Sequence, residues 1–220
     1  MISYTSAGYF LESARADSRH ALCGPQHLNG AVSPNSGLPL LLVASLDTAD
    51  PRLGISNLKL DTLHLLYSWT CGISEGVFSY RESSERVEII AYTKGPFQDD
   101  FPYKNYPLFF PRVPVELKIL TPEEQVLIER LNRREVGPAQ LGRQFPGLWA
   151  PHSQLGGEPR LLQWPLRPCH CPVCGGKMPL LASVGNQTGS TLGFTTNDFV
   201  QTVFFLCDTC TVVTAYNMCD

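Results

Sequence analysis

The stretch RPCHCPVCGGKMPLL, residues 167–181, places three cysteines and a histidine around a Gly-Gly pair. Cys171 and Cys174 form a Cys-x-x-Cys pair, and a second pair, Cys207 and Cys210, begins where the apolar segment VQTVFFLC ends. Four thiolates complete the tetrahedral shell that structural zinc prefers. The doubled motif therefore predicts a structural Zn²⁺ site in which all four cysteines are ligands.

Other kinds of cysteine site fit the sequence less well. A thioredoxin-like dithiol needs its Cys-x-x-Cys at the start of a helix, whereas the surrounding glycine and proline favour a turn, in which Gly175 can adopt a positive φ. A catalytic zinc would use a histidine or carboxylate and leave one coordination position open. Cys169 and His170 adjoin the motif, but neighbours on a strand point to opposite sides. We expect both to be bystanders, although the sequence leaves open whether either contributes to the metal site.

Composition and charge exclude several classes of protein. The chain has 220 residues and 43% apolar content, which is enough for a buried core. Its 17 basic and 20 acidic residues give a net charge of −3 without like-charge blocks, which argues against direct nucleic-acid binding. The longest apolar run is too short to cross a bilayer, and the amino terminus lacks the pattern of a secretory signal. We expect a cytoplasmic protein that does not bind membranes and whose thiols stay reduced.

Two segments predict helices. Residues 3–22 place apolar side chains at helical spacing with charges between them, which predicts a surface helix. Residues 121–137, TPEEQVLIERLNRREVG, predict a second helix with a capping box formed by Thr121 and Glu124. Gly137 is its expected end, because a glycine followed by proline is typical of helix termination.

The rest of the chain alternates between strand and loop patterns. LPLLLVASLD, LHLLYSWTC and RVEIIAY predict an antiparallel meander, and MPLLASV, VQTVFFLC and TVVTAY predict further strands. Residues 95–114 contain five prolines and predict an extended connection outside any ladder. Residues 138–168 predict a second loop-rich connection.

The two strand regions resemble each other. LLLVASLD matches PLLASVGN, so that Ala44 and Ser45 correspond to Ala182 and Ser183; LHLLYS matches VFFLCD, and EIIAY matches VVTAY, with Tyr92 corresponding to Tyr216. The alternative is chance similarity among buried strands, which use few residue types. We expect an α+β fold in which one compact domain, residues 1–220, contains two tandem degenerate antiparallel β units, residues 1–114 and 115–220, with a few helices. The second unit carries the paired zinc knuckles.

No catalytic constellation stands out. The five histidines are scattered, and the sequence has no nucleophile elbow, phosphate-binding loop or dinucleotide fingerprint. His152 heads the segment HSQLGGEPRLLQWP, and Asp99 and Asp100 lie in the proline-rich connection, where a solvated loop is the simpler interpretation. We expect no catalytic residues, no organic cofactor and no enzyme activity.

Three motifs, HSQLGGEPRLLQWP, CPVCGGKMPLLASVGN and GFTTNDFVQTVFFLCDTC, resemble the carboxy-terminal half of the bacterial YwqG-like family. The first half resembles the family more loosely, since Ser45 stands where a glutamine is usual and a Gly-Gly-x-Pro motif is missing. The resemblance covers residues 38–210. It implies a duplicated α+β fold shared with chaperones similar to programmed cell death protein two, and an immunity role beside secreted polymorphic toxins.

The resemblance and the lack of a catalytic motif together predict a protein-binding module. The leading hypothesis is an immunity protein that blocks a cognate toxin by direct binding. A client-specific zinc-containing chaperone is one alternative. A small-ligand binder or enzyme is another, and it predicts a deep pocket near His152 and Trp164.

Overall fold

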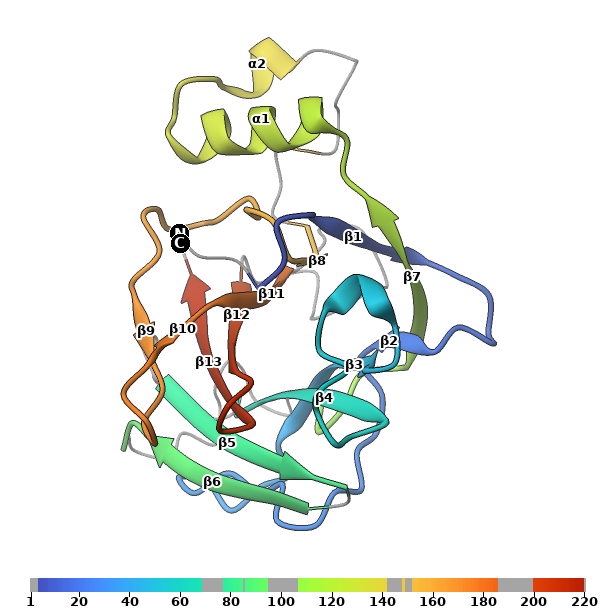
Figure 1. Cartoon of the computed structure of the whole chain (residues 1–220), viewed down its shortest axis with the longest axis vertical. Helices are drawn as coiled ribbons and strands as arrows, with labels where there is room; N and C mark the ends of the chain where they lie inside the picture. The colour runs from blue at the N-terminus through green and yellow to red at the C-terminus, as the bar shows by residue number, and fades with distance from the viewer. Residues whose placement is uncertain are drawn as a thin grey trace.

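The computed structural model describes residues 4–68, 77–84, 86–94, 107–141, 148, 152–185 and 200–219 (Figure 1). Strands predominate, and α1 is the main helix. The elements in chain order are β1 (Tyr9–Ser13), β2 (His20–Leu22), β3 (Leu41–Asp47), the 3₁₀ turn η1 (Pro51–Leu53), β4 (Thr62–Tyr67), β5 (Val77–Ser83), β6 (Arg86–Tyr92), β7 (Val113–Ile119), α1 (Pro122–Asn132), α2 (Pro138–Leu141), β8 (Gln154–Leu155), β9 (Cys169–His170), β10 (Lys177–Met178), β11 (Leu180–Gly185), β12 (Val200–Cys207) and β13 (Val212–Cys219).

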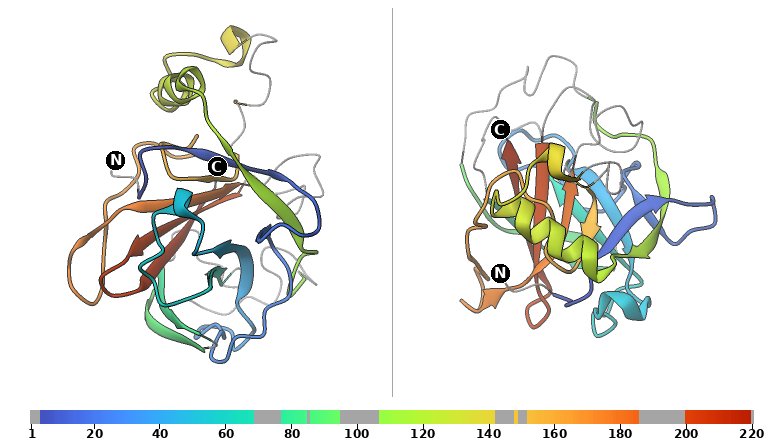
Figure 2. Two further views of the ribbon diagram at one scale, coloured as in Figure 1. Left: turned by 45° about the vertical axis from the view of Figure 1, so that its right-hand side comes forward. Right: turned by 90° about the horizontal axis from the view of Figure 1, so that it is seen from above.

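Eleven strands form one antiparallel sheet that curls into a half-barrel (Figures 1 and 2). The order across the sheet is β4-β3-β2-β7-β1-β8-β11-β12-β13-β5-β6. β9 and β10 form a separate two-stranded ribbon beside β13 and β5 (Figure 1). The main core fills the curl of the half-barrel, and α1 lies outside it, near β1 and β8 (Figures 1 and 2).

The predicted helix over residues 3–22 is wrong, because this segment forms β1 and β2. β1 pairs with β7 in the register Tyr9↔Ile119 to Ser13↔Val115, and its other edge pairs with β8. Leu11 is buried in the main core, while Phe10 packs on the opposite side, in the cluster beneath α1. Partners more than one hundred residues away in sequence thus override a weak local helical pattern.

The expected meander is only partly correct. β3 pairs with β4 and β5 pairs with β6, both antiparallel, but β4 and β5 are not ladder neighbours. Side chains connect them instead. The buried Tyr80 hydroxyl donates to the His64 carbonyl at 2.6 Å and accepts from the Leu66 N–H at 2.9 Å. The buried Glu82 carboxylate accepts the His64 backbone N–H at 2.8 Å and contacts its Nδ1 at 2.5 Å.

Helix α1 has the predicted capping box, since the side chains of Thr121 and Glu124 each accept the other's backbone N–H. The helix ends at Asn132, five residues before the expected Gly137, and Arg134 adopts a φ of 59°. Asn132 is buried, and its side chain bonds the backbone of the segment that follows β8. The left-handed backbone of Arg134 ends the helix before the glycine, and the Asn132 contacts attach this end to the segment after β8.

The two predicted connections also contain regular structure. Residues 95–106 lie outside the described residues, but Val113 and Pro114 begin β7. Pro114 has no N–H to donate, and it lies beyond the last ladder pair with β1, Ser13↔Val115, where its carbonyl accepts the Ala14 N–H at 2.9 Å. The second connection, 138–168, contains α2 and β8.

Matching hydrogen bonds recur in the two halves of the sheet. The Cys23 N–H donates to the Val43 carbonyl, and the Gly156 N–H donates to the Leu181 carbonyl, both at 2.9 Å. The next residue in each case, Gly24 or Gly157, bonds a carbonyl in the segment before β7 or β1 at 3.0 Å. All four donors have positive φ, and the two hairpins that follow carry bulges at Leu42/Ala44 and Leu180/Ala182.

The Tyr92–Tyr216 correspondence does not fit this pattern. Tyr92 lies on the outer strand β6 opposite Phe78, whereas Tyr216 lies on β13 opposite Val77 of β5. β13 has ladder partners on both edges, whereas β6 is the outermost strand, so the two tyrosines do not occupy matching places in the sheet order.

Gly156 lies where the segment after β8 crosses the amino-terminal segment. It has a φ of 61°, and a Cβ there would overlap the Thr5 hydroxyl and the Ala7 carbonyl oxygen. Gly37 has a similar φ of 72°, but nothing lies within 4 Å of where its Cβ would be. Both glycines have a left-handed backbone, but only at Gly156 would an added Cβ overlap neighbouring atoms.

We expect Gly156→Ala to lower the free energy of unfolding by about 3 kcal/mol, because backbone strain and overpacking add together. Gly37→Ala should cost about 1 kcal/mol, from backbone strain alone. Urea unfolding of both variants measures the difference. Equal losses would contradict the close crossing.

Candidate metal centre

The first cysteine pair lies in the turn of the β9–β10 ribbon. Cys171 donates its N–H to the Gly176 carbonyl at 2.8 Å, and Gly175 donates its N–H to the Cys171 carbonyl at 2.9 Å. Gly175 has a φ of 72°, which confirms the predicted left-handed conformation. The turn places Cys171 and Cys174 at the end of the ribbon.

The second pair lies in the tight turn between β12 and β13, where Cys207 pairs with Val212. Thr211 follows Cys210 as Gly175 follows Cys174, and its φ is 54°. A β-branched residue is rare in this conformation. The residue after the second cysteine is therefore left-handed in both turns, but only in the first turn is that residue a glycine, which makes this conformation predictable from the sequence.

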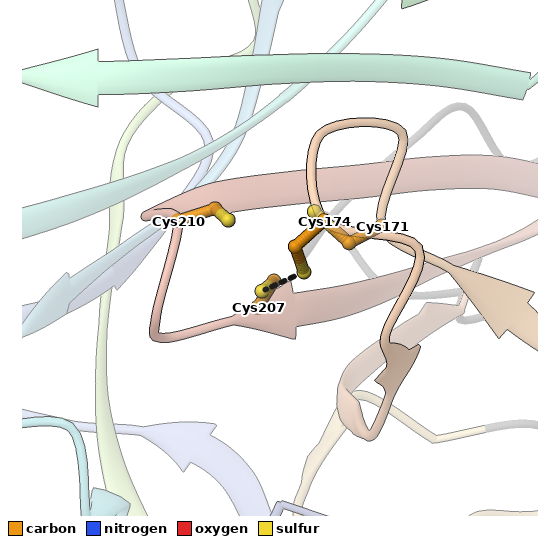
Figure 3. Close-up of side chains that lie close together, drawn as sticks. All are labelled: Cys171, Cys174, Cys207 and Cys210. Atoms are coloured by element: carbon orange, nitrogen blue, oxygen red, sulfur yellow. Dashed lines mark hydrogen bonds between the residues drawn. The ribbon is translucent and has the colours of Figure 1, made fainter.

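The two turns face each other, so that the four thiols converge (Figure 3). All four Sγ atoms lie within 4.8 Å of one another, and the Cys174 and Cys207 sulfurs are 3.8 Å apart. Four sulfurs around a zinc ion at 2.3 Å would be about 3.8 Å apart, so the spacing fits a tetrahedral ion. The structure brings together all four cysteines that the sequence predicts as ligands, in a group that could hold a metal ion.

The surroundings of the four thiols affect their protonation unequally. The Gly176 N–H bonds the Cys174 sulfur and lowers the pKa of that thiol to about 7. Burial raises the pKa of Cys207 to about 12, and the hydrogen bond with Cys174 raises the pKa of Cys210. The Cys210 N–H bonds the Cys207 sulfur and opposes the effect of burial. A cation between the sulfurs would favour the thiolate form of all four.

Cys169 and His170 point to opposite sides of the ribbon, as expected. Cys169 is buried with its sulfur 3.9 Å from that of Met178, and burial raises its thiol pKa to about 11. His170 is exposed and lies opposite Lys177. Neither belongs to the four-cysteine group. Of the remaining cysteines, Cys23 is buried, and the side chains of Cys71 and Cys219 lie outside the described residues.

Two buried amides, which sequence reasoning missed, hold the segment that leads into the first turn. Gln201 Nε2 donates to the Arg160 carbonyl and the Ser183 hydroxyl, both at 2.6 Å, and its Oε1 accepts the Leu162 N–H at 2.9 Å. Asn132 Oδ1 accepts the Leu161 N–H at 2.9 Å. The only available signal was a glutamine inside the largely apolar strand VQTVFFLC.

His152, the histidine that heads the segment HSQLGGEPRLLQWP, packs against another ring. The half-buried His152 ring lies 5.1 Å from the Phe10 ring, between β1 and β8. A pocket beside β13 is lined by Gln163 and Pro165, the two chain neighbours of Trp164, but His152 is not among its lining residues.

A buried histidine that the sequence did not single out, His20, is engaged at both ring nitrogens. Nδ1 accepts the Asp47 N–H at 3.2 Å, and Nε2 lies 2.9 Å from Asp50 Oδ2. Arg52 bonds the same carboxylate and lowers the pKa of Asp50 well below its usual value. This cluster ties η1 to β2 and to β7, because Arg52 also donates to the Leu117 carbonyl at 3.1 Å.

No family model matches the chain, and no curated protein or solved structure is significantly similar to it. Within the described ranges, no helix is both long and apolar enough to span a bilayer.

Proposed function

We propose that the four cysteines bind one structural Zn²⁺ and that the protein is a scaffold that binds another protein without chemical turnover. The single observation that carries the zinc site is the set of four thiols within 4.8 Å of one another, and the protein-binding role rests on the resemblance of the sequence motifs. Four thiolates fill a tetrahedral shell and leave no position for water or substrate. The ion would connect the β9–β10 ribbon to the β12–β13 turn, which is an architectural role.

Donor chemistry supports zinc over harder metals. All four donors are sulfur, which suits zinc and excludes the oxygen-rich shells of calcium and magnesium. The backbone N–H groups of Gly176 and Cys210, which bond two of the sulfurs, would offset the negative charge of a zinc–tetrathiolate centre. A reducing cytoplasm, the compartment predicted from the sequence, would keep the thiols available.

Purified protein should contain about one zinc per chain, measured by elemental analysis, since four thiolates bind one ion. Cys171→Ser and Cys207→Ser should each lose the zinc and lower the free energy of unfolding by about 4 kcal/mol or more, because site assembly is coupled to folding. Cys169→Ser is the matched control, because this neighbouring thiol is no ligand and its variant should keep the zinc. Stable wild-type protein without metal would refute the site.

The sequence resemblance supplies the specific form of the binding role, an immunity protein that neutralises a cognate secreted toxin. A zinc-containing chaperone for one client protein is the second candidate, and it differs in releasing its partner.

Co-expression with the product of the adjacent gene tests the immunity proposal. We expect the two proteins to co-purify as a stable complex and the toxicity of the partner to be suppressed. A chaperone would instead release a folded client, so the complex would be transient. Failure to bind any product of the flanking genes would contradict the immunity role, whereas zinc content tests the metal site separately.

We also infer that residues 1–114 and 115–220 are related β units that arose by duplication. The sheet order supports this inference, since β2, β3 and β4 on one side of the central β7–β1 pair match β8, β11 and β12 on the other. The matched hydrogen bonds of Cys23 and Gly156 support it independently.

Sequences of homologues test the duplication. Positions matched by hydrogen bonding, such as Val43 with Leu181 and Gly24 with Gly157, should be more similar to each other than positions matched at other offsets. A common ancestor for the two units predicts this difference, and chance similarity predicts none. Equal similarity at all offsets would overturn the inference.

A further inference from the structure

A cavity of about 310 Å³ lies between the outer face of the sheet and the segment that leads into the first cysteine turn. β5, β6 and β13 form its floor, and residues 163–172 form its wall. This volume is at the lower end of the range of small-molecule sites, about 300–1,000 Å³. The cavity is separate from the four-cysteine group and is used by no function proposed above.

The floor of the cavity carries no charged side chain, and its one amide, that of Asn217, accepts the Tyr67 hydroxyl at 3.0 Å. Val77, Ala91, Leu166 and Met218 supply much of the cavity surface. The hydroxyls of Ser79 and Thr214 also line it, but they bond each other at 2.8 Å. The floor therefore favours an apolar ligand body, because burial of such a body leaves few polar groups of the ligand to satisfy.

The permanent charge among the described residues that line the cavity is the guanidinium of Arg167. Arg167 and His170 are exposed lining residues, and no aspartate or glutamate is among the described residues that line the cavity. Lys177 lies directly opposite His170 in the ribbon, so the two side chains share a face and both are exposed. The cavity thus combines an apolar floor with a positively charged wall, in a protein whose net charge is −3.

We propose that this cavity binds a small organic anion, with an apolar body against β5 and β13 and a carboxylate or similar group beside Arg167. A guanidinium matches a carboxylate in geometry as well as charge. The wall is positioned near this site because the Tyr216 hydroxyl donates to the Arg167 carbonyl at 3.4 Å. The Tyr216 ring is in turn stacked on Phe205, with the ring centroids 5.5 Å apart.

The wall also connects the cavity to the proposed zinc site. Cys169 and Pro172, which line the cavity, flank Cys171 in the first cysteine turn. The shape of the wall therefore rests on the proposed zinc. Binding must be measured on protein of known metal content, so that loss of the metal is distinguished from failure of the cavity to bind.

The probe is 2-naphthoate, with the neutral isostere 2-naphthamide as the comparison, titrated into zinc-loaded protein by calorimetry. We expect saturable one-to-one binding of naphthoate, at least about tenfold tighter than naphthamide, because only the carboxylate pairs with Arg167. Arg167→Gln should weaken naphthoate about tenfold and leave naphthamide unchanged. Ala91→Trp should abolish binding of both by filling the cavity.

Ile119→Trp is the matched control, because this exposed β7 residue does not line the cavity and its variant should bind as the wild type does. Zinc content and unfolding by urea establish that each variant is folded and loaded. Three results would overturn the proposal: no saturable binding by the loaded wild type, equal affinity for naphthoate and naphthamide, or full binding by folded Ala91→Trp. A result of this kind in zinc-loaded protein leaves the metal proposal intact, whereas metal-free protein refutes that proposal directly.

Discussion

The pairing of β1 with β7 is the contact on which the architecture depends. β1 also pairs with β8, and β7 also pairs with β2, so each strand lies between partners from the other half of the chain. Neither half can complete its part of the sheet alone, because its first strand adds to the other half. The contacts of Gly24 and Gly157 lie at the two points where the chain crosses to make this exchange.

Two places in the curled sheet are held by contacts other than a ladder, namely the gap between β4 and β5 and the β9–β10 ribbon. At one seam, Tyr80 and Glu82 bond the backbone of β4 in place of a ladder. At the other end, the proposed zinc would join the ribbon to the β12–β13 turn. The first device uses buried hydrogen bonds, which are costly to leave unmade, and the second uses metal ligation. Both restrain segments that have no ladder partner at that point.

One segment of the chain forms the wall of the cavity and leads to the proposed zinc site. The position of this segment therefore affects the proposed binding of a ligand in the cavity. Residues 159–162 are fixed by Asn132 and Gln201, and the chain then runs along the cavity into the cysteine turn. Buried side-chain amides of this kind fix the course of the backbone through hydrogen bonds and not through hydrophobic burial. The wall of the cavity is therefore held at one end by these amides, and the proposed zinc would hold it at the other.

Local signals in the sequence determined the elements whose causes are local. The buried runs that became β3, β11 and β12, the capping box at Thr121 and the four clustered cysteines all follow from residue type and spacing over a few positions. The match of Ala44 with Ala182 also came from sequence alone, and the two residues occupy equivalent places beside bulges.

Only the tertiary structure decided the elements whose causes lie far away in the chain. Residues 9–13 became a strand because β7 and β8 pair with both of their edges, and no window of sequence contains those partners. The roles of Asn132 and Gln201 both depend on the same distant segment, whose backbone they bond at Leu161 and Leu162. Sequence thus identified which residues could bind a metal, whereas long-range pairing decided how the chain is closed and where a cavity forms.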